Sequence, residues 1–240
     1  MTKGPKVTAL TVKKQLSSLA DSEKAIDLSR FFKTKRGEYG EGDVFLGVIV
    51  PKQRSVAKKF RNLPLVEIAK LLKSSVHEHR FTALEILVMQ YEVANVLGQK
   101  KIVSSYLKHT DRVNNWDLVD TSAPYILGPY LYDKDRKILY KLAKSKNIWE
   151  RRIAILSTFL FIKRNDFSDS FHLVDILIGD CHDLIHKACG WMLREIGKRN
   201  KKELVRYLSS RYDMMPRTML RYGIEKFNRE ERNAYLNNLI

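Results

Sequence analysis

Apolar residues recur at helical spacing along most of this chain. In segments such as 182–199 they stand three and four residues apart, which places them on one face of a helix. No convincing run of alternating apolar and polar residues predicts a strand, so the expected fold class is all-α. The pattern predicts helices at 6–19, 22–36, 52–61, 64–75, 78–96, 134–146, 148–164, 182–199, 201–211, 214–226 and 229–238.

Two stretches depart from this regular pattern. The segment 114–127 is also expected to be helical, but Pro124 should kink or end the helix near Ala123. The stretch from Gly37 to Gly47 is the least helical, because it contains four glycines. It lacks the lysine followed by serine or threonine that ends a phosphate-binding loop, so we interpret it as a connector.

The helical segments also repeat along the chain. A basic residue stands three positions before a small residue at 80–83, 151–154 and 187–190. Arg80 and Arg151 are 71 residues apart, Arg151 and Lys187 are 36 apart, and the segment 115–118 falls in the missing frame. Such intervals are typical of stacked helix pairs. The chain is therefore predicted to be an α-solenoid, a single domain of HEAT-like repeats over 1–240, with an irregular helical bundle as the alternative.

Charge narrows the partners of such a chain. Among 240 residues, 44 Lys and Arg face 27 Asp and Glu, which gives a net charge of +17. This excess predicts attraction to phosphate backbones or to anionic membranes. The membrane alternative is weaker, because the most apolar run, 154–162, is too short to span a bilayer. Residues 1–19 lack the continuous apolar stretch of a secretory signal, and we expect a cytoplasmic protein without a membrane partner.

Trp116 and Asp120 are the first candidates for chemistry. They are four residues apart, so on a helix the indole ring and the carboxylate share one face. A carboxylate on a largely apolar face costs free energy unless it is paired or used. The plainer alternatives are a buried ion pair of Asp120, for instance with Arg152, and an ordinary core role for Trp116.

A second tryptophan lies on the polar face of the segment 182–199. At 100° per residue, the core face of this helix is expected to hold Ile185, Ala188, Cys189, Met192 and Ile196. Trp191 falls on the opposite side, among Lys187, Arg194 and Lys198. Bases that bind phosphates and a ring that packs on sugar or nucleobase are typical of a nucleic-acid surface. The alternative is that Trp191 packs against a neighbouring repeat under the lysine stems.

The same segment begins with a pattern that resembles a zinc-binding motif. His182 and His186 are four residues apart, and Cys189 shares their face. However, Asp183 stands where such motifs carry glutamate, and no distant third ligand is apparent. We therefore expect no metal and no other cofactor.

Several of these residues belong to segments that resemble a known family. They are Phe-Leu-Gly at 45–47 with Pro51 and Arg54, Trp-Asp-Leu-Val-Asp at 116–120 with Pro124, Asn-Ile-Trp-Glu-Arg-Arg-Ile-Ala-Ile-Leu at 147–156, and Gly-Trp-Met-Leu-Arg-Glu at 190–195. In this order they are similar to the AlkD-like DNA alkylation repair glycosylases, which are built from HEAT-like repeats. The resemblance covers most of the chain.

The resemblance implies a role for each candidate residue. Asp120 corresponds to the catalytic carboxylate, and Trp116 and Trp191 to the aromatic pair that lines the lesion site. Arg152 corresponds to an arginine near the DNA backbone. One residue departs from the family pattern, since Phe31 stands where the family can carry a tyrosine in its second helix.

The expected function is hydrolysis of the N-glycosidic bond of cationic alkylated purines, of the 3-methyladenine and 7-methylguanine type. The substrate would be double-stranded DNA, read from a concave basic surface by Arg152, Lys187, Arg194 and Lys198. A monofunctional enzyme that leaves an abasic site is expected, acting as a monomer in the bacterial nucleoid. The alternatives are a non-catalytic HEAT-repeat protein that binds damaged or distorted DNA, and a protein-binding scaffold.

Overall fold

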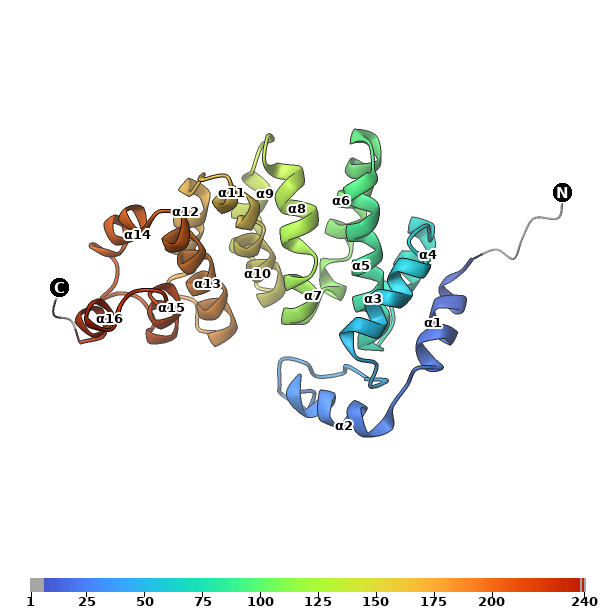
Figure 1. Ribbon diagram of the computed structural model, residues 1–240. Coiled ribbons are helices and arrows are strands. Elements are labelled where there is room, and N and C mark those ends of the chain that lie inside the picture. Colours follow the sequence, from blue (N-terminus) through green and yellow to red (C-terminus); the bar gives the residue numbers. More distant parts are fainter. Residues whose placement is uncertain (1–6, 238, 240) are drawn as a thin grey trace. The chain divides into compact units, whose positions relative to one another are not determined.

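The computed structural model describes residues 7–237 and 239, and it is built from helices (Figure 1). Across this part of the chain, the one strand-like feature is an isolated bridge that pairs Val44 with Val76. The all-α prediction is therefore confirmed, and the fold is of the α-solenoid class. The chain divides into two compact units, Met1–Ser122 and Ala123–Ile240. The assignment of 1–240 to a single domain of HEAT-like repeats stays a prediction.

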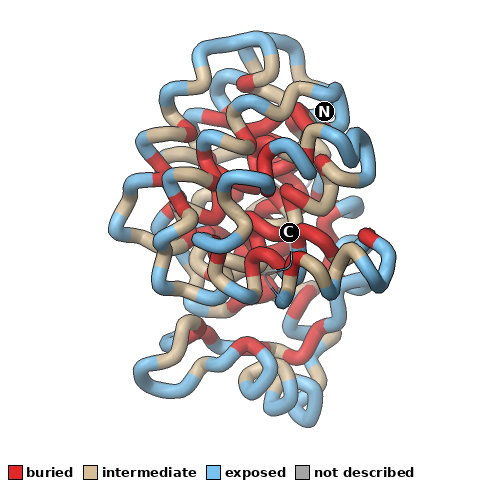
Figure 2. The backbone as a smooth tube through the Cα atoms, turned by 90° about the vertical axis from the view of Figure 1, so that its left-hand side faces the viewer, coloured by how far each residue is buried: buried red, intermediate tan, exposed pale blue. Residues whose placement is uncertain are grey.

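The first unit contains seven α-helices and a short 3₁₀ turn among its described residues. They are α1 Ala9–Ser17, α2 Ser22–Phe31, α3 Val50–Lys59, α4 Leu65–Leu72, α5 His77–Val93, α6 Val96–Lys108, η1 Thr110–Arg112 and α7 Trp116–Asp120. Figure 1 shows α3 and α4 packed against α5, the longest helix of this unit. In α2 no residue is buried, whereas the loop after it contains buried residues such as Asp43 and Phe45. Figure 2 shows exposed and buried positions along the backbone.

The second unit continues the succession of helices. They are α8 Ala123–Leu131, α9 Lys137–Ala143, α10 Ile148–Leu156, α11 Phe159–Lys163, α12 Ser168–Leu177, α13 Asp183–Arg199, α14 Lys201–Leu208, α15 Arg217–Gly223 and α16 Arg229–Leu236. The centre of this unit is α13, which packs against α10, α14 and α15. Within the described residues, no helix is both long enough and apolar enough to cross a membrane.

Most predicted helices are present, but two were missed. α6 begins with the exposed residues Val96 and Leu97, so its apolar positions do not lie on one face. In α12 the buried positions include Ser170, which interrupts the apolar period. The outer ends of the predicted helices 6–19 and 229–238, at residues 6 and 238, lie outside the described residues.

Two predicted helices are each divided in two. The segment 148–164 breaks at Ser157 and Thr158, whose hydroxyls donate to the carbonyls of Ile153 and Ile155 over 2.7 Å and bend the chain. The segment 114–127 breaks at residues 121–122, and α8 starts at Ala123. The predicted kink or end of the helix near Ala123 is therefore confirmed. Pro124 itself stands in the first turn of α8, where its missing N–H has no partner to lose.

A repeated local structure precedes α5, α10 and α13. In each case a short polar side chain accepts a hydrogen bond from the backbone N–H two residues later. The three acceptors are Ser74 Oγ at 3.1 Å, Ser145 Oγ at 3.0 Å and Asp180 Oδ1 at 2.9 Å. The equivalence of these helix starts supports the repeat that was inferred from the basic residues.

A side-chain donor six residues further on completes this repeated structure. Arg80, Arg151 and His186 each donate to the carbonyl oxygen six residues earlier, over 2.9, 3.0 and 2.5 Å. The third member of the series is therefore His186 rather than the predicted Lys187. The intervals between the three residues are therefore 71 and 35. The predicted third member, Lys187, lies one residue after the structural one.

Candidate nucleic-acid interface

Trp116 and Asp120 are the first and last residues of α7, and both are half-buried. The prediction that they lie on one helix is confirmed. This helix has only five residues, whereas isolated helices shorter than about 12 residues are not stable in water. The position of both side chains therefore depends on the contacts that hold α7 to the rest of the first unit.

Three polar contacts and two apolar side chains hold α7. Asn115 caps its start, with Oδ1 accepting from the Trp116 N–H at 2.8 Å. Just beyond its end, the Thr121 hydroxyl donates to Glu85 Oε1 of α5 at 2.7 Å. In the middle, Asp117 Oδ2 lies 2.8 Å from His77 Nε2, also of α5. Leu118 and Val119 are fully buried, so α7 is held along its length.

An aromatic cluster backs the Trp116 ring. The ring stacks on Phe32 at 5.3 Å between centroids and meets Phe31 edge-on at 5.9 Å. Phe32 in turn stacks on Phe45 at 5.1 Å. Phe31 is 62% exposed, so it and the half-buried Trp116 together present apolar ring surface to solvent. The residue that departs from the family pattern thus lies against a predicted site residue.

A network of buried charged residues packs against this aromatic cluster through the ring of His77. His77 Nδ1 lies 2.9 Å from Asp43 Oδ2, and Arg80 Nη2 donates to Asp43 Oδ1 at 2.6 Å. Burial lowers the pKa of His77, but the charge and hydrogen bond of Asp117, with the hydrogen bond of Asp43, raise it to about 9. Burial raises the pKa of Asp43, but His77 and Arg80 outweigh this and hold it below its usual value. We therefore expect a cationic His77 at neutral pH.

The sequence interpretation missed His77, Asp43, Asp117 and Arg80 as members of the site. The available indication was the run His-Glu-His-Arg at 77–80, four consecutive polar residues at the start of a helical segment that is apolar at most later positions. All four are buried. Glu78 accepts from the backbone N–H groups of residues 46, 47 and 48 at 2.8–3.2 Å, and so holds the loop that carries Phe45.

The glycine at the centre of that loop is required by its surroundings. Gly47 has φ +81°, and a Cβ there would lie 2.0 Å from the backbone oxygen of Asp21. A larger residue would push the loop away from the start of α2. The glycine-rich connector predicted at 37–47 is thus confirmed as a loop with left-handed positions, and it brings Asp43 and Phe45 to α5.

Trp191 lies on α13 in the second unit. All five residues predicted for the core face of this helix are buried, which confirms its orientation. Trp191 is half-buried, its ring lies 6.0 Å from that of Phe159, and its Nε1 donates to Glu195 Oε1 at 3.2 Å. Its surroundings therefore include an acid and an aromatic ring as well as the predicted cations.

The three predicted cations of α13 each have an acidic partner. Lys187 Nζ lies 2.7 Å from Asp183, and Lys198 Nζ lies 2.7 Å from Glu195. Arg194 pairs with Glu225. A phosphate that binds here must compete with these carboxylates, so the surface is less cationic than the residue types alone indicate.

Arg152 of α10 is buried, with 5% of the residue exposed. Its Nη1 donates to the backbone oxygen of Leu184, near the start of α13, at 2.6 Å. The guanidinium thus ties α10 to α13 inside the second unit.

The two histidines at the start of α13 have structural partners. His182 caps the helix by accepting from the Leu184 N–H at 3.2 Å, and His186 donates to the Asp180 carbonyl. Within the described residues, no three His, Cys, Asp or Glu side chains are grouped so that they could bind a metal ion. These contacts account for the motif that resembled a zinc site.

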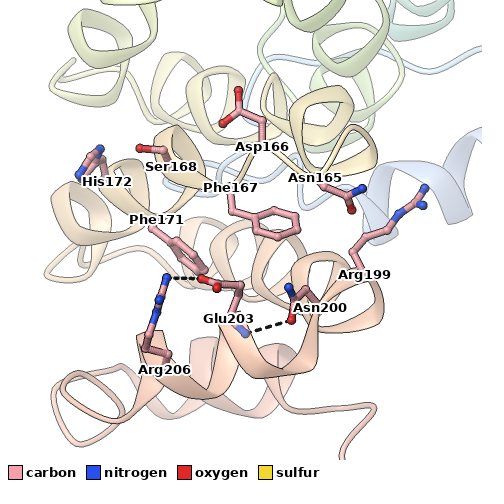
Figure 3. A pocket seen from close by; sticks show the side chains of 10 residues that line it. All are labelled: Asn165, Asp166, Phe167, Ser168, Phe171, His172, Arg199, Asn200, Glu203 and Arg206. Carbon is pink, nitrogen blue, oxygen red and sulfur yellow. Dashed lines mark hydrogen bonds and ion pairs between the residues drawn. The ribbon is translucent and has the colours of Figure 1, made fainter.

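A cavity of about 790 Å³ opens beside α12 and α14 of the second unit (Figure 3). Phe167 and Phe171 form its apolar part, and Arg206 pairs with Glu203 at its edge over 2.5 Å. The ten residues that line it do not include any of the predicted site residues. The cavity is therefore separate from the predicted site residues of α13.

Comparisons with known proteins agree with the resemblance seen in the sequence. A family model described as DNA alkylation repair enzyme matches residues 12–227. A solved structure, described as a predicted DNA alkylation repair enzyme from Enterococcus faecalis, is similar with a TM-score of 0.67. It is 15% identical, and the match covers 88% of this chain and 97% of that one, so it bears on the fold. Among curated proteins, none matches this chain.

Proposed function

Because the chain belongs to the DNA alkylation repair enzyme family, we propose that it is a DNA glycosylase. Its substrate is duplex DNA that carries cationic alkylated purines of the 3-methyladenine and 7-methylguanine type. The observation that carries the proposal is the pair formed by Trp116 and Asp120, one turn apart and half-buried at the two ends of α7. An aromatic ring beside a carboxylate suits a reacting centre that gains positive charge.

The chemistry follows from the lability of the substrate. Alkylation at N3 or N7 makes the purine cationic and weakens its bond to the sugar. Cleavage passes through a state with oxocarbenium character, which the Asp120 carboxylate stabilises while it orients the attacking water. The ring of Trp116, and that of Trp191 as its proposed partner, attract the cationic base by about 0.5–2 kcal/mol per contact. The base already carries positive charge, so it leaves without a general acid.

The product is an abasic site, because no lysine is proposed as a nucleophile. The enzyme is thus a monofunctional N-glycosyl hydrolase that acts as a monomer without a cofactor. Lys187, Arg194 and Lys198 bind the DNA backbone by exchanging their carboxylate partners for phosphates. The proposed part of the buried Arg152 is a fixed positive charge near the backbone.

The decisive experiment measures free bases. The protein is incubated with methylated duplex DNA, and released 3-methyladenine and 7-methylguanine are quantified against DNA alone. Asp120→Asn keeps the size of the side chain and removes its charge, so we expect retained DNA affinity and an excision rate lower by about 10²–10³-fold.

Asp111→Asn is the matched control, because Asp111 is an exposed aspartate of the same unit. It should excise at the wild-type rate. Full activity of Asp120→Asn would show that Asp120 is not the catalytic carboxylate. Wild-type protein that binds the DNA but releases no base above the spontaneous rate would leave the non-catalytic alternative.

A further inference from the structure

We propose that His77 is a positioning residue of this site: as an imidazolium held between Asp43 and Asp117, it sets the position of α7 and thereby of Trp116 and Asp120. The proposal rests on the proposed function for its effect on excision. The claim that His77 sets the position of α7 does not depend on that function, and it is tested separately by the fluorescence of Trp116.

The hydrogen bonds of His77 require a cationic ring. Its Nδ1 lies 2.9 Å from Asp43 Oδ2, and its Nε2 lies 2.8 Å from Asp117 Oδ2. A neutral imidazole has one N–H donor, whereas ionised carboxylates only accept. Both contacts can be made together when both ring nitrogens carry protons.

Both carboxylates also accept hydrogen bonds from other donors. Asp43 Oδ1 accepts from Arg80 Nη2 at 2.6 Å. Asp117 Oδ1 accepts from the Leu118 N–H at 2.9 Å. With both carboxylates acting as acceptors, the ring nitrogens of His77 are left as the donors in its two contacts.

The charged groups that face His77 come from three elements. Asp43 lies in the connector, Asp117 on α7 and Arg80 on α5 itself, while Arg112 of η1 acts on Arg80. Within the group formed by His77, Asp43, Asp117 and Arg80, two carboxylates are balanced by the imidazolium and the guanidinium. Loss of the imidazolium proton would leave this group with a net negative charge and would remove the His77 donor from one carboxylate. This is costly because His77 is buried, with 2% of the residue exposed.

The same ring is part of the aromatic cluster. It lies 4.6 Å from the Phe45 ring and 4.9 Å from Phe32, on which Trp116 stacks. His77 therefore contacts both the carboxylate beside Trp116 and the ring beneath it. Because α7 has only five residues, a shift of Asp117 moves both ends of the helix. A displacement of about 1 Å at a reacting centre can cost about 10²-fold in rate.

The test compares two histidines of the same helix. His77→Gln keeps one hydrogen bond and removes the charge, whereas His79→Gln changes a buried ring that bonds to Ser74 Oγ at 2.8 Å. Single-turnover excision at saturating DNA is measured from pH 6 to 10 with DNA alone as the blank, together with the Kd for DNA. Wild type and His79→Gln should lose activity as pH rises through about 9. His77→Gln should be slower by about 10²-fold, with an unchanged Kd and no loss near pH 9.

A second measurement does not need activity. Of the three tryptophans, Trp149 and Trp191 are replaced by phenylalanine, so that Trp116 alone reports on α7. Its fluorescence should shift as pH rises through about 9 when His77 is present, and should stay constant with His77→Gln. If the wild-type protein releases no base, the proposed function fails while this measurement still decides the role of His77.

Two results would overturn the proposal. One is a His77→Gln protein with the wild-type rate and pH profile. The other is an equal loss in His77→Gln and His79→Gln, which would assign both to general stability. If His77→Gln does not fold, Asp117→Asn removes the charge at the half-buried end of the same contact and should lower the single-turnover rate in the same direction. Wild-type kinetics in that variant would count against the proposal.

Discussion

The two longest helices, α5 and α13, each have 17 residues and a central place in their unit, yet they bury different chemistry. The buried residues of α5 include His77, Glu78, Arg80 and Glu85, whereas those of α13 are apolar residues, a glycine and Cys189. The charged groups of α5 hold Asp43, the loop 46–48 and the end of α7 by directed hydrogen bonds.

This difference concerns how each helix positions its neighbours. Apolar packing accepts small shifts, because it is not directional. A buried charge, in contrast, loses much free energy when its partner moves. The helix that carries the proposed catalytic pair is therefore held by the less tolerant kind of contact.

Glu78→Ala should have the largest effect on stability. It leaves three backbone N–H groups of the loop 46–48 without their acceptor, and we expect a loss of about 3–5 kcal/mol in the free energy of unfolding. The counterpart on α13, Glu195→Ala, removes a half-buried acid that contacts Lys198 and Trp191 Nε1, and should cost less, about 1–2 kcal/mol. Urea denaturation measures both. Similar losses would erase the contrast between the two helices.

The free energy of unfolding should also depend on pH through His77. The pKa of His77 is about 9 in the folded protein and about 6.5 when unfolded, so folding favours its protonated form. This contribution, of about 3 kcal/mol at most, is fully present below pH 6.5 and is lost as pH rises through about 9. Unfolding measured between pH 6 and 10 should show this decline in wild type and His79→Gln. A decline of equal size in His77→Gln would assign it to another group.

A shape-conserving change in the core of α13 should cost less. Met192 is fully buried, and Met192→Leu keeps the apolar character and nearly the volume. We expect a loss below about 1.5 kcal/mol and an unchanged pH dependence. Thermal unfolding at pH 7 and pH 9 checks both. A larger loss would mean that α13 is packed as specifically as α5.

The smallest effect on stability is expected at the surface of α13. Lys198 pairs with Glu195 while 42% of its side chain is exposed, so Lys198→Ala should change the free energy of unfolding by less than about 1 kcal/mol. If Lys198 binds a phosphate, the plot of log K for DNA against log salt should be less steep for Lys198→Ala than for wild type, by about 0.9 in slope. Titrations at several salt concentrations measure this slope. An unchanged slope would remove Lys198 from the interface.

The parts of the fold that were predicted correctly depend on neighbours along the chain. The core face of α13 follows from apolar residues three and four positions apart. The predicted helix starts at 148 and 201 match α10 and α14, which are capped by Asn147 and Asn200. Trp116 and Asp120 could be paired because four residues separate them on one helix. The helices α6 and α12 were missed because apolar residues are exposed in the first, at Val96 and Leu97, and a polar residue is buried in the second, at Ser170. Periodicity assumes the opposite, with apolar residues buried and polar residues exposed.

Contacts between residues that are far apart in the sequence could not be predicted from local patterns. His77 meets residues 34 and 40 positions away, and nothing in the run His-Glu-His-Arg names Asp43 or Asp117 as partners. A buried polar residue and an exposed one look the same in a pattern of polarity. Apolar periodicity was enough to establish the helices and their inward faces, because it depends on local geometry. The partners of the buried charges follow from the packing of loop, helix and turn, which brings together groups that the chain keeps far apart.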